Sequence, residues 1–295
     1  EERSVEELLR SGFVVLDKWQ GPTSHDAVAS VKKILGLKKT GHAGTLDPAV
    51  SGVLLVTLEN ACKVIPALQG LDKEYVGVMH LHREVEAKKL SEVVKKFVGD
   101  IRQRPPVRSA VARKERKRRV HSFEILEING KDVLFKTSVE AGTYIRVLCH
   151  DIGKLAGGAH MAELRRTKSG DFGEERVVKM HELADAYAFW KEGRESRIRD
   201  YVMPVEAAVE HLGKIAIKDS AVFSVTGGTP LYTQGVAKVT EGISRDDMVA
   251  VMTLKGELVA LAKAAMSSEE MIHRKGAAAK TDRVVMEKGI YPKVR

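Results

Sequence analysis

The sequence predicts an α+β protein with a mixed-sheet domain over residues 1–210 and a small β-barrel domain over residues 211–295. Three observations support this fold class. The chain has 295 residues, and at about 150 residues per domain this length favours two domains. Up to residue 210, strand and helix patterns interleave without a strict βαβ repeat, which favours α+β over α/β. After His211, short Val/Ala/Ile runs alternate with turns that contain Gly or Asp, as in a small barrel.

The individual elements follow from apolar periodicity and from cap and turn residues. Thr23 or Ser24 can cap a helix, and Asn129-Gly130 between two strand patterns predicts a hairpin. We expect strands at 12–16, 52–58, 74–81, 120–128 and 133–139, and helices at 25–35, 90–98, 143–155, 181–190 and 198–211. In the second domain, the strand-like runs are 216–217, 221–225, 236–239, 248–254, 257–262 and 283–286.

Positive charge is concentrated in one segment. The chain carries 49 Lys and Arg against 40 Asp and Glu, a formal net charge of +9. Residues 101–121 hold nine of these cations, seven of them Arg, and one anion, Glu115. Arg suits forked phosphate contacts better than Lys does, and Pro105-Pro106 stiffens the start of the segment. The segment is therefore interpreted as a clamp on a nucleic-acid backbone, with a solvated loop or a localisation tract as the alternative.

Several other classes of protein are disfavoured. The sequence has no GxxxxGK[ST], HExxH or GxSxG motif, which argues against ATP use, metalloprotease chemistry and an α/β-hydrolase site. Cys62 and Cys149 form no CxxC or Cys/His cluster, so no metal site is predicted. No apolar run approaches the roughly 20 residues that span a membrane, and the first ten residues do not resemble a signal peptide. We expect a soluble protein of a reducing compartment.

The densest candidate site is the segment 41–48, GHAGTLDP. Its glycines permit close approach of a ligand, and Pro48 moves Asp47 out of the helical region of backbone space. Asp47 would then present an ionised carboxylate from a held loop, with an ordinary Asp-Pro turn as the alternative.

A second candidate site is the segment 141–146, AGTYIR, which places Tyr144 and Arg146 at a strand-to-helix junction. In extended backbone both side chains would face the same side. The alternative is a helix start with the tyrosine in the core and the arginine in solvent.

Together these segments resemble the TruB-type pseudouridine synthases, and within them the archaeal guide-RNA-dependent branch related to eukaryotic dyskerin. The resemblance spans essentially the whole chain, and its C-terminal part is similar to PUA RNA-binding domains. The stretch 104–111 (RPPVRSAV) and the PUA-like part favour the guide-dependent branch, while Cys62 stands where the family more often has Thr. The matching motifs are DKxxGPTS (17–24), GHAGTLDP (41–48), KEYVG (73–77), VEAGTYIR (139–146), GAHM (158–161) and ELRRTKSG (163–170).

The resemblance implies isomerisation of uridine to pseudouridine in rRNA or tRNA, directed by an H/ACA guide RNA and without a cofactor. The bond between N1 of uracil and C1′ of the sugar is cleaved, and the base is rejoined through C5. Asp47 would attack the sugar as a nucleophile or remove a sugar proton. Arg146 would be its counter-ion in a site largely closed to water, and Tyr144 would help to remove the C5 proton.

Four further residues receive substrate-binding roles by resemblance. The target uridine must leave the RNA stack to be reached, and an aromatic side chain can replace the lost stacking. Tyr75 would stack on the extruded base and His42 would hold the loop or the backbone beside it. Leu164 and Lys18 complete the expected substrate contacts.

Two RNA-binding surfaces are also implied. One would follow the basic segment and a nearby arginine pair, and the other would use two turns of the PUA-like barrel that grip the guide. We therefore expect removal of residues 212–295 to weaken guide binding more than it damages the catalytic pocket. The residues are Arg102, Arg104, Arg108, Arg113, Lys114, Arg116, Arg118, Arg119, Arg165 and Arg166 on the first surface, and Gly227, Gly228, Gln234 and Gly235 on the second.

The expected partners are the guide and substrate RNAs, small Nop-type and Gar-type accessory proteins, and a kink-turn-binding ribosomal-like protein. The expected location is the cytoplasm, with no membrane contact. Two other functions are consistent with the residues. A stand-alone enzyme would modify the tRNA T-loop without a guide, and a non-catalytic scaffold would only bind RNA. Asp47, Tyr75, Tyr144 and Arg146 together argue against the scaffold, which would not need them.

Overall fold

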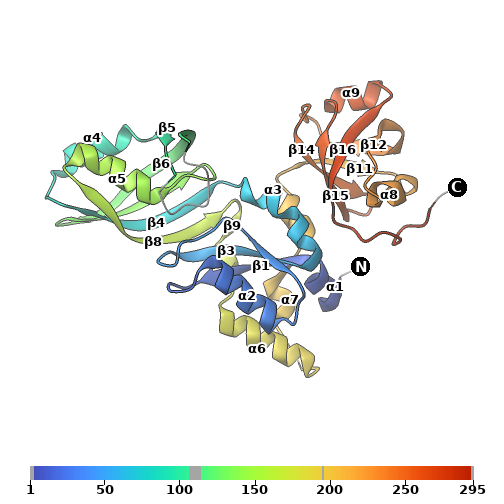
Figure 1. Ribbon diagram of the computed structural model, residues 1–295, viewed down its shortest axis with the longest axis horizontal. Coiled ribbons are helices and arrows are strands. Elements are labelled where there is room, and N and C mark those ends of the chain that lie inside the picture. Colours follow the sequence, from blue (N-terminus) through green and yellow to red (C-terminus); the bar gives the residue numbers. More distant parts are fainter. Residues whose placement is uncertain (1–2, 106–113, 195, 294–295) are drawn as a thin grey trace.

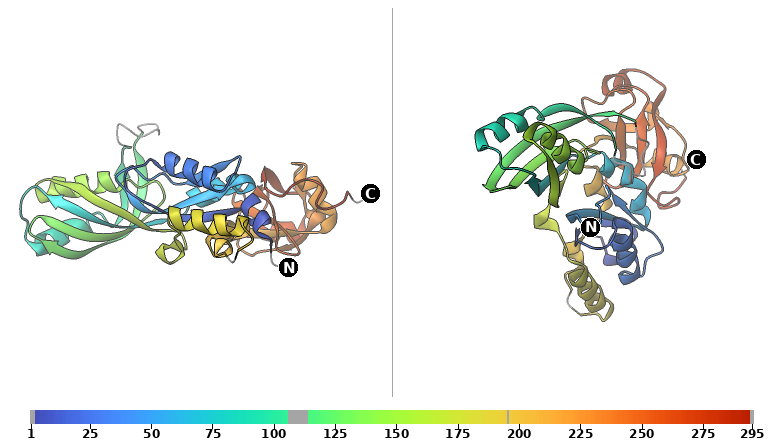
Figure 2. Two further views of the ribbon diagram at one scale, coloured as in Figure 1. Left: turned by 90° about the horizontal axis from the view of Figure 1, so that it is seen from below. Right: turned by 60° about the vertical axis from the view of Figure 1, so that its left-hand side comes forward.

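The structure is a computed structural model that describes residues 3–105, 114–194 and 196–293 of the chain. Two β-sheets organise these residues, one of ten strands and one of six. Figure 1 shows the larger sheet with its helices as one lobe and the smaller sheet, in orange and red, as a second lobe. The two lobes follow one another along the long axis of the molecule (Figure 2). This arrangement confirms the predicted α+β class, with a mixed-sheet domain followed by a small barrel.

The large sheet has the strand order β10-β1-β3-β8-β4-β7-β6-β5, with β2 paired to β3 and β9 to β8. The pairing of β3 with β8 is parallel, whereas the other pairings in this sheet are antiparallel, so the sheet is mixed. Its strands are β1 (Gly12–Lys18), β2 (Thr40–Ala43), β3 (Ser51–Leu58), β4 (Lys73–Leu81), β5 (Gly99–Gln103), β6 (Arg116–Asn129), β7 (Asp132–Val139), β8 (Ala159–Ser169), β9 (Phe172–Gly173) and β10 (Val202–Pro204).

Helices cover this sheet and carry ordinary start and stop signals. Ser4 and Thr23 form capping boxes at α1 and α2, and Gly157 ends α5 in the left-handed conformation. None of the helices in the described residues is both long and apolar enough to cross a membrane. The helices of this lobe are α1 (Val5–Arg10), α2 (Ser24–Ile34), η1 (Glu59–Val64), α3 (Ile65–Gln69), α4 (Ala87–Lys95), α5 (Ile145–Ala156), η2 (Glu174–Arg176), α6 (Met180–Lys191), α7 (Ile198–Tyr201) and η3 (Val205–Val209).

The second lobe is a barrel-like sheet of order β12-β16-β15-β14-β11-β13 with two helices against it. Its interior is filled by small and branched apolar residues such as Val251, Val259 and Ala279. The elements are β11 (Gly213–Ile217), α8 (Asp219–Thr226), β12 (Leu231–Tyr232), η4 (Thr233–Gly235), β13 (Val236–Val239), β14 (Met248–Thr253), β15 (Leu258–Ala264), α9 (Ser268–His273) and β16 (Ala277–Val284).

One apolar core joins the two lobes. Phe13 and Val15 point from β1 into a cluster that also contains Met252, Leu261 and Val285 of the barrel. The opposite face of β1 packs into the core beneath α2 and α6, which explains why its apolar run is continuous rather than alternating. The barrel is therefore packed against the sheet rather than tethered to it by a linker.

Residues 198–211 do not form one helix, so that prediction was wrong. The segment is divided into α7, β10 and η3, and β10 pairs with β1. Pro204 has no N–H group to continue a helix, and the free edge of β1 offers strand hydrogen bonds instead.

Four smaller predictions also differ from the structure. Residues 221–225 lie in helix α8, where Val222 and Val225 share a buried face, and β16 lies at Ala277–Val284 rather than 283–286. The hairpin loop is Gly130-Lys131, because Asn129 still pairs with Asp132. Strand β6 begins at Arg116, so part of the basic segment is strand and not loop.

Candidate active site

Asp47 lies in the loop between β2 and β3, opposite the first turn of α5. The Nη2 of Arg146 donates a hydrogen bond to the Oδ2 of Asp47. Both side chains remain open to solvent, with 55% of Asp47 and 52% of Arg146 exposed. The two motifs are therefore in contact, as expected. The protein by itself leaves both side chains open to water, although a site closed to water was expected.

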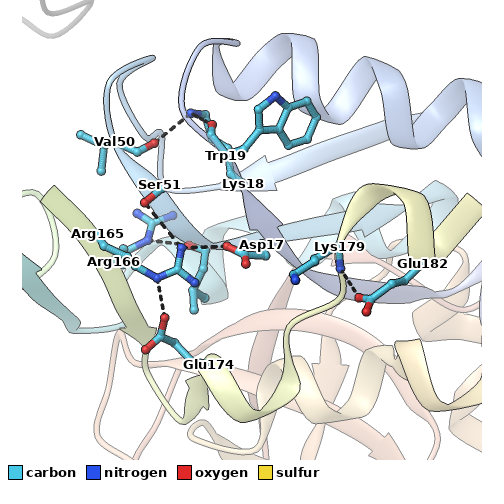
Figure 3. A network of polar contacts seen from close by, with 11 residues as sticks. Asp17, Lys18, Trp19, Val50, Ser51, Arg165, Arg166, Glu174, Lys179 and Glu182 are labelled. Carbon is cyan, nitrogen blue, oxygen red and sulfur yellow. Dashed lines mark hydrogen bonds and ion pairs between the residues drawn. The ribbon is translucent and has the colours of Figure 1, made fainter.

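Lys18 holds this loop from below. Its side chain is completely buried, and its Nζ donates to the carbonyl oxygens of Trp19 and Val50, both at 2.9 Å (Figure 3). The Nζ also lies 3.3 Å from the carbonyl oxygen of Asp47. Burial lowers the pKa of Lys18, and the charge of Asp47 opposes that shift. The expectation that Lys18 contacts substrate is corrected, because its ammonium group is enclosed by main-chain oxygens of the loop.

Arg166 is a second buried cation under the same loop. It is 1% exposed, and it donates from Nε to Val53 O at 2.7 Å and from Nη2 to Gly44 O at 2.9 Å. The predicted contact of Arg166 with an RNA backbone is therefore wrong: the guanidinium is used inside the protein.

Arg165 and Arg166 do not act as a pair. Consecutive residues of a strand point to opposite faces, and Arg165 turns away from Arg166 toward Asp17 and Glu174 (Figure 3). Its nitrogens lie 2.9 Å from Asp17 Oδ1 and 2.5 Å from Glu174 Oε1. In the sheet, β4 and β7 separate β8 from β6, so this residue does not extend the surface of the basic segment.

Ser24 is a loop-holding residue that sequence reasoning treated only as a possible helix cap. The Oγ of Ser24 accepts from Leu46 N at 2.8 Å and donates to Leu46 O at 2.9 Å. It is buried, and Thr23 caps the helix instead. The residue immediately before Asp47 is thus fixed at its backbone, which complements the contacts of Lys18 on the other side.

Tyr75 and Leu164 form an apolar floor beside this loop. Tyr75 pairs with Arg166 across β4 and β8, and Gly77 pairs with Leu164, so these positions share one face. Tyr75 is 8% exposed and Leu164 is 7% exposed. Only glycine fits at 77, because a Cβ there would lie 2.7 Å from the Glu163 carbonyl oxygen.

His42 is half-buried on β2. Burial lowers its pKa, as do the charges of Arg166 and His25 to a smaller extent, so the imidazole is neutral at pH 7. Its Nδ1 is buried and has no hydrogen-bond partner among the described residues.

Tyr144 and Arg146 are not in extended backbone together, so the geometric argument from alternation was wrong. Tyr144 is the N-cap of α5, with φ −93° and ψ 105°, and Arg146 already belongs to the helix. The strand-to-helix junction itself is where it was expected, between β7 and α5. The helical turn, not a shared strand face, directs Arg146 toward Asp47.

The basic segment is only partly within the described residues, since Arg108 and Arg113 lie outside them. Strand alternation divides the rest: Arg116 and Arg118 pair with Gln103 and Ile101, whereas Arg119 projects to the other face. Arg102 forms an ion pair with Glu115 at 3.2 Å. Of the cations predicted to bind RNA in this segment, those exposed in the structure are Arg102, Arg104, Lys114, Arg116 and Arg119.

The two turns predicted to bind RNA in the barrel lie at opposite ends of α8. Gly227-Gly228 follows the helix in an exposed turn. Gln234 and Gly235 are tied to the other end by Lys218, whose N donates to Gly235 O and whose Nζ donates to Gln234 O, both at 2.9 Å.

Comparisons with known proteins agree with this geometry. The model of the TruB family pseudouridylate synthase N-terminal domain matches residues 32–88 and 82–145, and that of the tRNA pseudouridylate synthase B C-terminal domain matches 146–210. A "Probable tRNA pseudouridine synthase B" of Pyrococcus horikoshii is 56% identical over 297 residues, covering 99% of this chain and 89% of the relative. The chain belongs to the TruB family of pseudouridylate synthases. A relative of the same name from Methanopyrus kandleri is 52% identical and covers 99% of this chain and 88% of the relative.

Solved structures allow a finer comparison of this TruB family member. A chain of a Cbf5-Nop10-Gar1 complex matches with a TM-score of 0.94 and 54% identity, covering 99% of this chain and 90% of that one. A chain of an H/ACA RNP bound to a substrate RNA containing 2′-deoxyuridine matches with a TM-score of 0.92 and 52% identity, over 99% and 90%. A PUA domain model matches residues 213–285. The resemblance inferred from the motifs is thereby confirmed.

Proposed function

We propose that this chain isomerises uridine to pseudouridine in RNA as the catalytic subunit of an H/ACA guide-RNA particle. The observation that carries the proposal is the contact of Arg146 with Asp47. Asp47 lies on a loop whose backbone is held from inside the protein by Lys18 and Arg166. Membership of the TruB family and the fold shared with Cbf5 support the reaction type and the particle.

The reaction needs an ionised carboxylate beside the sugar of an extruded uridine. Asp47 supplies it, as a nucleophile at the sugar or as a base that removes a sugar proton. The N1–C1′ bond breaks, the uracil turns, a C5–C1′ bond forms, and the C5 proton leaves as N1 gains one. Arg146 orients Asp47. Tyr144, two residues before Arg146, assists removal of the C5 proton, and Tyr75 stacks on the uracil base.

The exposure of Asp47 and Arg146 supports a role for bound RNA in closing the site. A carboxylate that is half open to water is surrounded by a higher effective dielectric than an enclosed one. The sugar and base of the target nucleotide would cover both side chains on binding. His42, which is neutral at pH 7, would line this pocket without adding charge.

RNA binding is assigned to two surfaces that remain part of the proposal. The first is the exposed cations of β5, β6 and the residues that flank these strands, which would follow a phosphate backbone. The second is the pair of turns around α8, Gly227-Gly228 and Gln234-Gly235, which would grip the guide. Residues 1–210 would then carry the chemistry and residues 211–295 the guide. The separation of the two sheets between Val209 and Gly213 supports this division.

The proposed partners are guide and substrate RNA, Nop10-type and Gar1-type proteins, and a kink-turn-binding protein. The first two protein types are supported by the solved Cbf5 complexes. Action on tRNA without a guide is the second candidate, because the curated relatives carry the name tRNA pseudouridine synthase B. A cytoplasmic location is also proposed, and the free thiols of Cys62 and Cys149 suit a reducing compartment.

Release of tritium from RNA that carries uridine labelled at C5 tests the proposal directly. The assay compares the chain alone on tRNA, the chain with guide RNA and partner proteins, and Asp47→Asn in each setting. Release that requires guide and partners and is lost in Asp47→Asn is expected. Release by the chain alone on tRNA would support the second candidate. Tight RNA binding with no release in any setting would leave a scaffold and overturn the proposal.

A further inference from the structure

Gln103 makes a two-way contact with the backbone of a distant active-site residue. It is the last residue of β5 and is 4% exposed. Its Oε1 accepts from Tyr144 N at 3.0 Å, and its Nε2 donates to Tyr144 O at 3.1 Å. The N–H and the C=O of one residue belong to two successive peptide units, so a carboxamide that pairs with both fixes the backbone on either side of that residue.

The backbone that Gln103 holds is the start of α5. Tyr144 is the N-cap of this helix, and its own side chain does not cap it. Its carbonyl oxygen also accepts the first helical bond, from Leu148 N at 3.0 Å. Gln103 thus makes, from strand β5, the contact to the N-cap N–H that a Glu or Gln at the third helical position makes in a capping box. Arg146, two residues further on, takes its direction toward Asp47 from this turn.

Strand β6, which pairs with β5, contacts the residues just before Tyr144 in the loop between β7 and α5. Arg119 N donates to Glu140 Oε2 at 2.9 Å, and Glu140 N donates to Arg119 O at 2.8 Å. The guanidinium of Arg118 packs over Gly142, where a Cβ would lie 3.1 Å from its Nε. The β5–β6 hairpin therefore contacts the loop at three successive points, of which Gln103 is nearest to the catalytic pair.

We propose that Gln103 is a positioning residue that sets the geometry of the Asp47–Arg146 pair through the backbone of Tyr144. The strand that carries it also carries the exposed Arg102, so the hairpin that presents cations to RNA is the one that holds the catalytic helix. Gln103 itself touches no reacting atom. Its loss changes the rate of the chemical step and leaves RNA affinity nearly as it was.

Gln103→Glu gives a readout that a general packing role would not give. The variant has the same shape, and its carboxylate still accepts from Tyr144 N but repels Tyr144 O. Protonation restores the missing donor, and burial beside a carbonyl oxygen raises the pKa of a carboxyl group. Turnover of Gln103→Glu is therefore expected to fall about tenfold or more at pH 8 and to recover as the pH is lowered. Gln103→Leu should be slow at every pH.

The rate measurement rests on the proposed function and uses the full chain with guide and partners, in single turnover at saturating RNA. Gln69→Glu, at an exposed glutamine at the end of α3, controls for the added charge and should follow the parent protein. If Gln103→Glu followed the parent protein at all pH values, or lost RNA affinity and rate together without recovery, the positioning role would be overturned. A parent protein without turnover would instead count against the proposed function.

Hydrogen exchange supplies a test that does not depend on activity. In Gln103→Leu the amides at the start of α5, that of Tyr144 above all, should exchange faster, while those in the centre of β4 stay protected. Unchanged exchange at Tyr144 would show that the carboxamide does not hold the helix start.

Discussion

The ammonium group of Lys18 lies 2.9 Å from the carbonyl oxygen of Val50, three residues beyond Asp47. A buried charge is thus stabilised by main-chain dipoles of the loop that presents the carboxylate, and loop and charge depend on one another. The position of Asp47 is set by contacts to the backbone on both sides of it, not by contacts to its own carboxylate alone.

Replacing Lys18 should therefore slow catalysis more than it weakens RNA binding. Lys18→Met keeps most of the length of the side chain but removes the donors to Asp47 O and Val50 O. We expect the single-turnover rate to fall about tenfold or more, since small displacements of a reacting group are costly. Lys154→Met, at a lysine that is 63% exposed and pairs with Asp151, is the control. Equal rates for the two variants would contradict this account.

The parallel contact between β3 and β8 requires glycine at position 52. Its φ is +104°, and a Cβ there would lie 2.1 Å from the Arg166 carbonyl oxygen. Gly99 has the same φ of +104°, but a Cβ there would have none of the described residues within 4 Å apart from its chain neighbours. Gly52→Ala should therefore lower the free energy of unfolding by roughly 3 kcal/mol or more, and Gly99→Ala by clearly less. Chemical denaturation of both variants measures the difference, and equal losses would refute the steric argument.

Lys73 should give the stability of the protein a distinctive pH dependence. It is 5% exposed, and burial, followed by the charge of Arg166, lowers its pKa from 10.5 to about 8. Between these two values the folded state binds fewer protons than the unfolded state, so the free energy of unfolding rises with pH. Below pH 8 both states are charged and the full cost of burial is present.

Comparison with Lys73→Met isolates this contribution from other groups that titrate in the same range. The free energy of unfolding of the parent protein should rise relative to that of the variant between pH 8 and 10.5, by an amount of order 3 kcal/mol. Parallel curves for the two proteins over this range would mean that Lys73 keeps its ordinary pKa in the folded state.

Glu206 should contribute to the attachment of the barrel. Its carboxylate accepts from Arg3 Nη1 at 2.6 Å and Nη2 at 2.7 Å, and from Leu258 N of β15 at 2.9 Å. Glu206→Ala leaves the buried Leu258 amide without this acceptor, and we expect a loss of about 1–3 kcal/mol in unfolding experiments. The exposed neighbour Glu210 provides the control, and Glu210→Ala should have little effect. A similar loss in both variants would argue against a specific role of Glu206.

The candidate site was largely predictable because its residues lie in short motifs. The residues that hold them in place, such as Arg166 and Gln103, could not be predicted from the sequence. Asp47 and Arg146 follow from GHAGTLDP and EAGTYIR, and the structure brings them into contact. Arg166 was misassigned because a sequence shows that an arginine is present but not which face of a strand it occupies. Gln103 could not be found at all, since its partner Tyr144 is 41 residues away.

The fold shows the same limit. Local signals were sufficient for β1, α2 and α5, whose apolar patterns and caps agree with their tertiary surroundings. They were insufficient for residues 198–211, where pairing with the free edge of β1 competes with helix propensity. They were also insufficient for α8, because the composition of this short helix resembles that of a strand. In each case the decisive partner lies far away in the sequence.

The apolar cluster that joins Phe13 to Met252 and Leu261 makes the barrel and the catalytic sheet one mechanical unit. Cutting the chain at 212 would uncover this surface, so a truncated protein would report on damage to the sheet as well as on lost RNA contacts. The same cluster keeps the α8 turns at a set distance from Asp47. If RNA binds at these turns, their fixed distance from Asp47 would determine which nucleotide of that RNA reaches the carboxylate.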